Sequence, residues 1–121
     1  MARGDRVRPR ELLIRDIAEW GDRLAGHLSG SAREALQSDA LLQDAVWPCF
    51  EVIGEAARGL MQADPGLEAK HPGLALRSAY ALRNRIAHGY AEIDYDVLWA
   101  TAHEAVPKMV AAARALLAGG R

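Results

Sequence analysis

The sequence has few of the features that mark a disulfide-bonded or membrane-spanning protein. Its 121 residues include one cysteine, Cys49, so no disulfide can form within the chain and no cysteine-rich metal site can be built. No apolar run approaches the roughly 20 residues of a membrane-spanning helix. The first apolar stretch, residues 12–14, is followed at once by Arg15 and Asp16, unlike a signal peptide. We therefore expect a soluble, cytoplasmic protein.

Aromatic residues are also scarce, at 6% of the chain, which argues against a β-sandwich. Half of the residues are hydrophobic, and most of these are alanine and leucine, which favour helices. The charged fraction of 26% is typical of a chain that folds. The composition therefore predicts one small all-α domain.

The chain lacks an excess of either charge, because its formal net charge is −1. Residues 1–10 nevertheless carry four arginines and one aspartate, a local balance of +3, which leaves −4 for the rest. A basic field over the whole protein is thus excluded, and any RNA contact has to come from a local cluster. We treat residues 1–9 as a basic tail. This tail could be disordered, could contact RNA or a partner, or could have no role.

Hydrophobic spacing predicts helices along the rest of the chain. Apolar residues recur at steps of three and four over 10–28, from 38 or 39 to 62, over 74–88, and from 94 or 96 to 118. Pro48 should kink or divide the second of these helices, and Pro107 should bend the last. Connections of short or medium length predict an antiparallel four-helix bundle, or up to five helices, over residues 10–118.

The most unusual segment lies at the end of the third predicted helix. It contains Arg83, Asn84, Arg85, His88 and Tyr90, and Asn84 is the only asparagine of the chain. Asn84 and His88 are four residues apart and share a helix face, and Arg83 and Tyr90, seven apart, have a similar azimuth. We expect these four to form one polar strip, with Arg85 pointing elsewhere. Histidine suits general acid–base chemistry and arginine suits phosphate binding.

The pattern Arg83-Asn84-x-x-x-His88-x-Tyr90 resembles the R-N-x-x-x-H-x-Y motif of HepT-like proteins in the HEPN superfamily. Residues 41–45 and 53–57 are similar to the second helix of that family, and residues 93–99 with Pro107 are similar to its last helix. The resemblance spans about residues 10–117. Two departures are Pro48 within the long second helix and the acidic Glu92 close to the motif.

This resemblance implies a HEPN-like bundle that forms a homodimer, with two copies of the motif facing one cleft. It implies a metal-independent endoribonuclease, the toxin of a toxin–antitoxin pair, with Arg83, Asn84 and His88 as catalytic residues. Arg85 is then a candidate RNA contact. The implied antitoxin is an MntA-like nucleotidyltransferase, which silences such a nuclease by AMPylation of the tyrosine that matches Tyr90. No cofactor and no metal site are expected.

Other interpretations of the same residues remain open. The chain could be a catalytically silent helical partner of a nucleotidyltransferase, or the motif a structural polar cap. Glu68 and His71 have the Glu-x-x-His spacing of di-iron bundles, but proline–glycine pairs flank them and no second pair exists. Glu55 is expected to orient packing or a basic side chain rather than to act in catalysis.

Overall fold

The structure, a computed structural model, describes residues 8–89 and 93–119, and this part of the chain contains helices and no strand. The elements are α1 (Arg10–Leu28), α2 (Arg33–Ser38), α3 (Ala40–Ala63), α4 (Leu67–Lys70), the 3₁₀ turn η2 (Pro72–Leu74), α5 (Leu76–His88), α6 (Tyr95–Ala100), the π-helical turn η4 (Thr101–Ala105) and α7 (Val106–Leu117). The predicted all-α class is confirmed. None of the described helices has the length and apolar character needed to cross a membrane.

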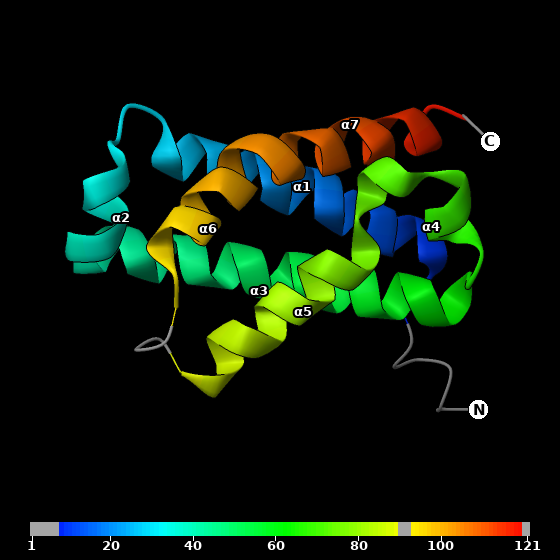
Figure 1. Ribbon diagram of the computed structural model, residues 1–121. Coiled ribbons are helices and arrows are strands. Elements are labelled where there is room, and N and C mark those ends of the chain that lie inside the picture. Colours follow the sequence, from blue (N-terminus) through cyan, green and yellow to red (C-terminus); the bar gives the residue numbers. More distant parts are fainter. Residues whose placement is uncertain (1–7, 90–92, 120–121) are drawn as a thin grey trace.

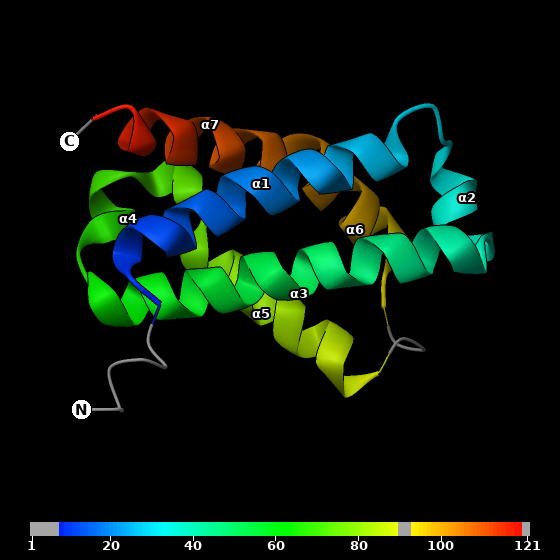
Figure 2. The same cartoon turned by 180° about the vertical axis from the view of Figure 1, so that it is seen from behind.

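The long helical segments run in alternating directions, as in an antiparallel bundle (Figure 1). α1 packs against both α3 and α7, and α5 packs chiefly on α3. Seen from either side, α5 diverges from the other helices and lies at the edge of the bundle (Figure 2). The fourth segment is composite, because α6, η4 and α7 follow one another without a loop.

The core forms where the apolar stripes of these segments meet. Its fully buried members include Ile17, Leu24, Leu60, Leu98 and Met109, all on the stripes predicted from spacing. Burying one such side chain stabilises a fold by roughly 1.5–3 kcal/mol. No polar or charged residue of the described part is buried. Val97, beside the buried Leu98 in the last predicted helix, is 42% exposed.

α3 remains one helix from Ala40 to Ala63, so the predicted division at Pro48 does not occur. Pro48 lies on the exposed side of the helix, where the ring meets solvent rather than a neighbouring helix. The loss of one backbone donor is tolerated within a helix whose other face is held by the core. At the start of α3, the carboxylate of Asp39 accepts hydrogen bonds from the amides of Leu41 and Leu42 and caps the helix, at one of the two predicted starts, 38 or 39.

The last predicted helix contains a π-helical turn before Pro107. Proline has no N–H group, so the usual i→i−4 bond cannot form at this position. Val106 instead donates its N–H to the carbonyl of Thr101, five residues back. Such π-turns often occur within α-helices at positions that depart from regular hydrogen bonding. The wider turn leads the chain from α6 into α7.

Candidate active site

α5 ends with His88 in its last turn, followed by Gly89. Gly89 has a backbone φ of +146°, a conformation that residues other than glycine rarely adopt. His88 is exposed, and its Nδ1 lies 2.6 Å from the backbone carbonyl oxygen of Asn84. A carbonyl oxygen can only accept, so Nδ1 carries the hydrogen of this bond. The Nε2 atom of His88 is therefore the nitrogen left to take up or deliver a proton.

The side chain of Asn84 is held by its neighbour Arg83. Arg83 Nη1 donates to Asn84 Oδ1 over 3.2 Å. Because the amide oxygen is the acceptor in this bond, the NH₂ group of Asn84 is left to donate elsewhere. Asn84 thus contacts Arg83 through its side chain and His88 through its backbone.

Arg83 is turned toward α3. Its Nη2 donates to Glu51 Oε2 over 3.4 Å, and its Nε lies 3.1 Å from Glu55 Oε2. The second contact is an ion pair without hydrogen-bond alignment, since Nε is buried and has no hydrogen-bond partner among the described atoms. The Arg83 side chain is 25% exposed, so these pairs are partly shielded from water.

A cavity of about 450 Å³ opens between the end of α5 and the start of α6. It is lined by Leu82, Asn84, Arg85, His88, Ile93, Asp94 and Val97. The expected grouping is therefore wrong in one respect: Arg85 faces this cavity with Asn84 and His88. Arg83, which directly precedes Asn84 in α5, does not line the cavity because its side chain packs on α3.

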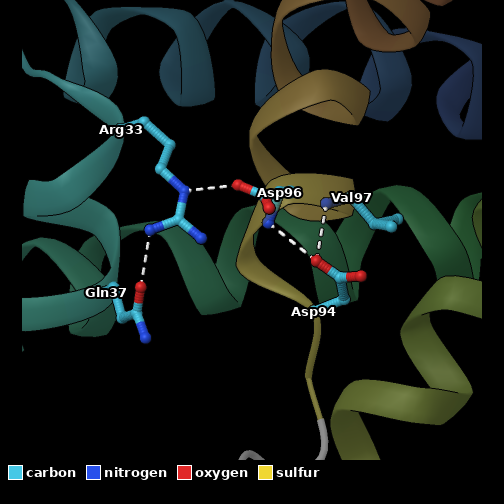
Figure 3. A network of polar contacts seen from close by, with 5 residues as sticks. All are labelled: Arg33, Gln37, Asp94, Asp96 and Val97. Carbon is cyan, nitrogen blue, oxygen red and sulfur yellow. Dashed lines mark hydrogen bonds and ion pairs between the residues drawn. The ribbon is translucent and has the colours of Figure 1, made fainter.

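Asp94 borders the cavity and also begins α6. Figure 3 shows one oxygen of its carboxylate accepting hydrogen bonds from the amides of Asp96 and Val97, at 2.9 and 3.3 Å. The positive end of the helix compensates part of the charge on this carboxylate. Asp96 in turn accepts from Arg33 Nε over 2.6 Å, which ties α6 to α2. The cavity wall on the α6 side is thereby fixed.

The cavity brings together groups suited to a phosphodiester. Arg85 supplies a fixed positive charge, Asn84 an amide donor, and His88 an imidazole suited to general acid–base chemistry. Its dimensions suit part of a nucleotide. Arg83 reaches this set only through Asn84, although both lie in the same helical turn.

Two features of this site were not expected from the sequence. Asp94 was expected only as the start of a helix, and Glu51 was not singled out at all. The spacing of Glu51 and Glu55, four residues apart on one helix face, was the available signal for a paired acidic contact. The expectation that Glu55 orients a basic side chain agrees with its ion pair to Arg83.

Two other expectations concern residues away from the cavity. Tyr90 lies outside the described residues. The carboxylate of Glu68 accepts a hydrogen bond from the backbone N–H of Arg77. Across residues 8–89 and 93–119, no three His, Cys, Asp or Glu side chains gather in a way that would hold a metal ion.

The fold and the site define a helical bundle that carries an arginine–asparagine–histidine motif at one helix end. A family model described as "Ribonuclease HepT-like" matches residues 17–116. The chain belongs to this family, the HepT-like ribonucleases. The match covers most of the bundle and the whole motif.

Curated relatives agree with this assignment. A protein of Methanocaldococcus jannaschii named "Putative RNase" is 27% identical over 94 residues, which are 78% of this chain and 75% of the relative. "Probable ribonuclease HepT" of Thermococcus cleftensis is 28% identical over 96 residues, 79% of this chain and 84% of the relative. No solved structure shows a significant match to the chain.

Proposed function

We propose that this protein is a metal-independent endoribonuclease whose site is formed by Arg83, Asn84 and His88, with Arg85 as a contact to the RNA. The observation that carries the proposal is the bond from His88 Nδ1 to the Asn84 carbonyl, 2.6 Å long, in a residue that borders the cavity. It leaves Nε2 available for proton exchange in a residue that lines the cavity. Membership of the HepT-like ribonuclease family supports the same function.

RNA carries its own nucleophile, the 2′-hydroxyl group. In the reaction, the 2′-oxygen loses its proton and attacks the phosphorus, and the bond from phosphorus to the 5′-oxygen breaks. The products are a 2′,3′-cyclic phosphate and a 5′-hydroxyl that has taken up a proton. Two His88 imidazoles, one from each chain of a dimer, exchange these protons, one as base and one as acid. Arg85 and the NH₂ group of Asn84 stabilise the charge on the phosphate oxygens. Arg83 holds the Asn84 amide from outside the cavity.

Cleavage of RNA in the presence of EDTA tests this function. His88→Ala should lower the cleavage rate by about 10²–10⁴-fold, the usual contribution of general acid–base catalysis. Because His88 is exposed, the variant should keep its helical circular dichroism spectrum. Substrate with a 2′-deoxy nucleotide at the cleaved position should resist cleavage. Arg83→Ala, measured in parallel, should also lose activity.

His103→Ala is a matched control for this experiment. His103 is exposed and, like His88, its Nδ1 contacts the carbonyl four residues earlier, that of Trp99, at 2.8 Å. It lies outside the cavity, so its removal should leave cleavage unchanged. A wild-type protein that binds a nucleotidyltransferase but cuts no RNA would favour the silent-partner function instead.

We further propose that the protein is the toxin of a toxin–antitoxin pair and acts as a homodimer with the site at the dimer cleft. The antitoxin is an MntA-like nucleotidyltransferase that AMPylates Tyr90, which adds phosphate charge where the RNA backbone has to bind. The support is the sequence Arg83-Asn84-x-x-x-His88-x-Tyr90 within a chain of this family. Incubation with ATP and a nucleotidyltransferase encoded beside it should add adenylyl groups and stop cleavage. Tyr90→Phe should prevent both effects, and Tyr80→Phe should prevent neither.

The division of the chain into a basic tail, residues 1–9, and a bundle, residues 10–118, also stays a proposal. The first described helix begins at Arg10, which is compatible with it. A chain that starts at residue 10 should keep the thermal unfolding midpoint of the full chain. A large drop in that midpoint would contradict the division.

A further inference from the structure

Two glutamates of α3 converge on one arginine of α5. Glu51 and Glu55 are one helical turn apart, and their carboxylates lie 3.4 and 3.1 Å from the Arg83 guanidinium. The two contacts differ in quality. Glu55 forms an ion pair with the buried Nε without hydrogen-bond alignment, whereas Glu51 accepts a hydrogen bond from an outer nitrogen and its side chain is more exposed, 58% against 44%.

The backbone beside Glu55 is adapted to this contact. A Cβ atom at Gly54 would lie 2.2 Å from Cβ of Arg83 and 3.1 Å from the backbone oxygen of Ala79. Only glycine allows α5 to approach α3 this closely at this point. The approach presses the first carbons of the Arg83 side chain against α3 and restricts its rotamers. The guanidinium is thereby directed along the α3 surface, where Glu55 meets it.

The contact continues from Arg83 into the cavity. Arg83 Nη1 holds the amide oxygen of Asn84, and Asn84 lines the cavity beside His88. If Arg83 moved away, the amide of Asn84 would be free to rotate and exchange its NH₂ group for its oxygen. A chain of contacts thus runs from Glu55 through Arg83 to the Asn84 amide.

We propose that Glu55 is a positioning residue for RNA cleavage: it fixes Arg83, and Arg83 fixes the Asn84 amide with its NH₂ group toward the bound phosphate. This inference rests on the proposed ribonuclease function. Glu55 touches no reacting atom in this scheme, and it acts only through Arg83.

The kinetic consequence differs from that of an ordinary acidic group near RNA. A carboxylate near a phosphate weakens RNA binding, so its removal alone should tighten binding and leave kcat the same or higher. Removal of a positioning group should instead lower kcat, since small displacements of a reacting group cost up to about 10²-fold. Glu55→Ala should therefore lower kcat by about 10- to 100-fold and leave KM unchanged or lower. The exposed site and the helix propensity of alanine favour normal folding of the variant.

Glu19→Ala is the matched control. Glu19 is an exposed glutamate of α1 that pairs with Arg23 over 2.9 Å, away from the cavity. Its removal should change neither kcat nor KM. Glu51→Ala should have a smaller effect than Glu55→Ala, because its contact with Arg83 is longer and more exposed.

A second measurement follows the chain of contacts without using activity. Asn84 is the only asparagine, so asparagine-selective ¹⁵N labelling gives one side-chain NH₂ signal pair in an NMR spectrum. Glu55→Ala should shift or broaden this pair, and Glu19→Ala should leave it in place. An unchanged pair, or an unchanged kcat, in Glu55→Ala would overturn the proposal. A wild-type protein that fails to cleave RNA would contradict the proposed function. The NMR comparison of Glu55→Ala with the wild type would still show whether Glu55 positions the Asn84 amide.

Discussion

Asn84 holds two neighbours in place with two different groups. Its backbone carbonyl accepts from His88 Nδ1, and its side-chain oxygen accepts from Arg83. The first contact selects the ring nitrogen that is free for chemistry, and the second selects the face of the amide that is free to donate. Asparagine is a poor helix former, and these contacts account for its place inside α5.

Asn84→Asp separates the two roles of this side chain. An aspartate keeps an oxygen for Arg83 but replaces the donor NH₂ group with a negatively charged oxygen that repels phosphate. The rate of RNA cleavage should fall by about 10²-fold, the usual loss when one such donor is removed. The urea unfolding curve should stay close to that of the wild type. Retained activity would show that the amide does not donate to the substrate.

The thiol of Cys49 should be inert in the folded protein. Burial raises the pKa of this thiol above its usual value, an effect that the charge of Arg23 offsets only in part. The raised pKa lowers the fraction of thiolate, which is the reactive form. A disulfide reagent at mildly alkaline pH should react slowly with the native protein and rapidly after urea is added. Fast reaction without urea would contradict the buried position of Cys49.

Sequence patterns singled out the residues of the candidate site but did not indicate where all of their side chains point. The motif identified Arg83, Asn84 and His88, because the unusual residue types occur together. The spacing alone could not indicate that Gly54 allows α3 to come close to Arg83 and draws it away from the cavity. That outcome depends on how two distant segments pack, which periodicity within one helix does not encode.

At the scale of elements, the contact between α3 and α5 determines the geometry of the site. α5 buries two of its residues, Leu76 and Ile86, and contacts α3 across Gly54. A substitution on α3 can therefore change the site without touching any residue that lines the cavity.

Gly54→Ala should both destabilise the fold and impair the site. Its Cβ would overlap Cβ of Arg83, so α5 has to shift, at a cost of about 1–3 kcal/mol. Gly26→Ala in α1 is the control, because no atom lies within 4 Å of a Cβ there. That change should stabilise the protein by roughly 0.5–1 kcal/mol, since alanine has a higher helix propensity than glycine. Urea unfolding of both variants measures the two effects, and equal stability of the two would contradict the close approach of α3 and α5.

The long helices were predictable from sequence, and the short ones were not. The predicted helix over 10–28 agrees with α1, the predicted start at 38 or 39 agrees with Asp39 as the residue before α3, and the predicted end at 88 agrees with the end of α5. α2 and α4 were missed because four to six residues are too few for a periodic pattern. α2 is held by tertiary contacts instead, with Leu36 buried and Arg33 bound to Asp96.

At the scale of the whole molecule, one chain supplies one His88. A single imidazole cannot easily serve as base and acid in the same step, which favours a cleft shared by two chains. The exposed Val97 and the open cavity beside α5 leave room for such a neighbour.

Subunit mixing tests this arrangement. If both histidines of a dimer are needed, a dimer of wild type and His88→Ala is inactive. After subunit exchange with a ninefold excess of His88→Ala, activity per wild-type chain should fall to about one tenth, because few wild-type chains meet one another. Excess His103→Ala should cause no such loss. Unchanged activity in the first mixture would mean that each chain works alone.

The peripheral position of α5 has a consequence for local opening of the fold. α1 and α3 each contribute a long row of buried side chains, whereas α5 is anchored at its two ends and rests mainly on α3. Segments with few buried contacts open more readily than the rest of a domain. Backbone amides of α5 should exchange with deuterium sooner than those in the middle of α1 and α3, and bound RNA or a second subunit should slow that exchange. We therefore expect α5 to be the least stable long helix of the protein, and to gain stability when RNA or a second subunit binds to it.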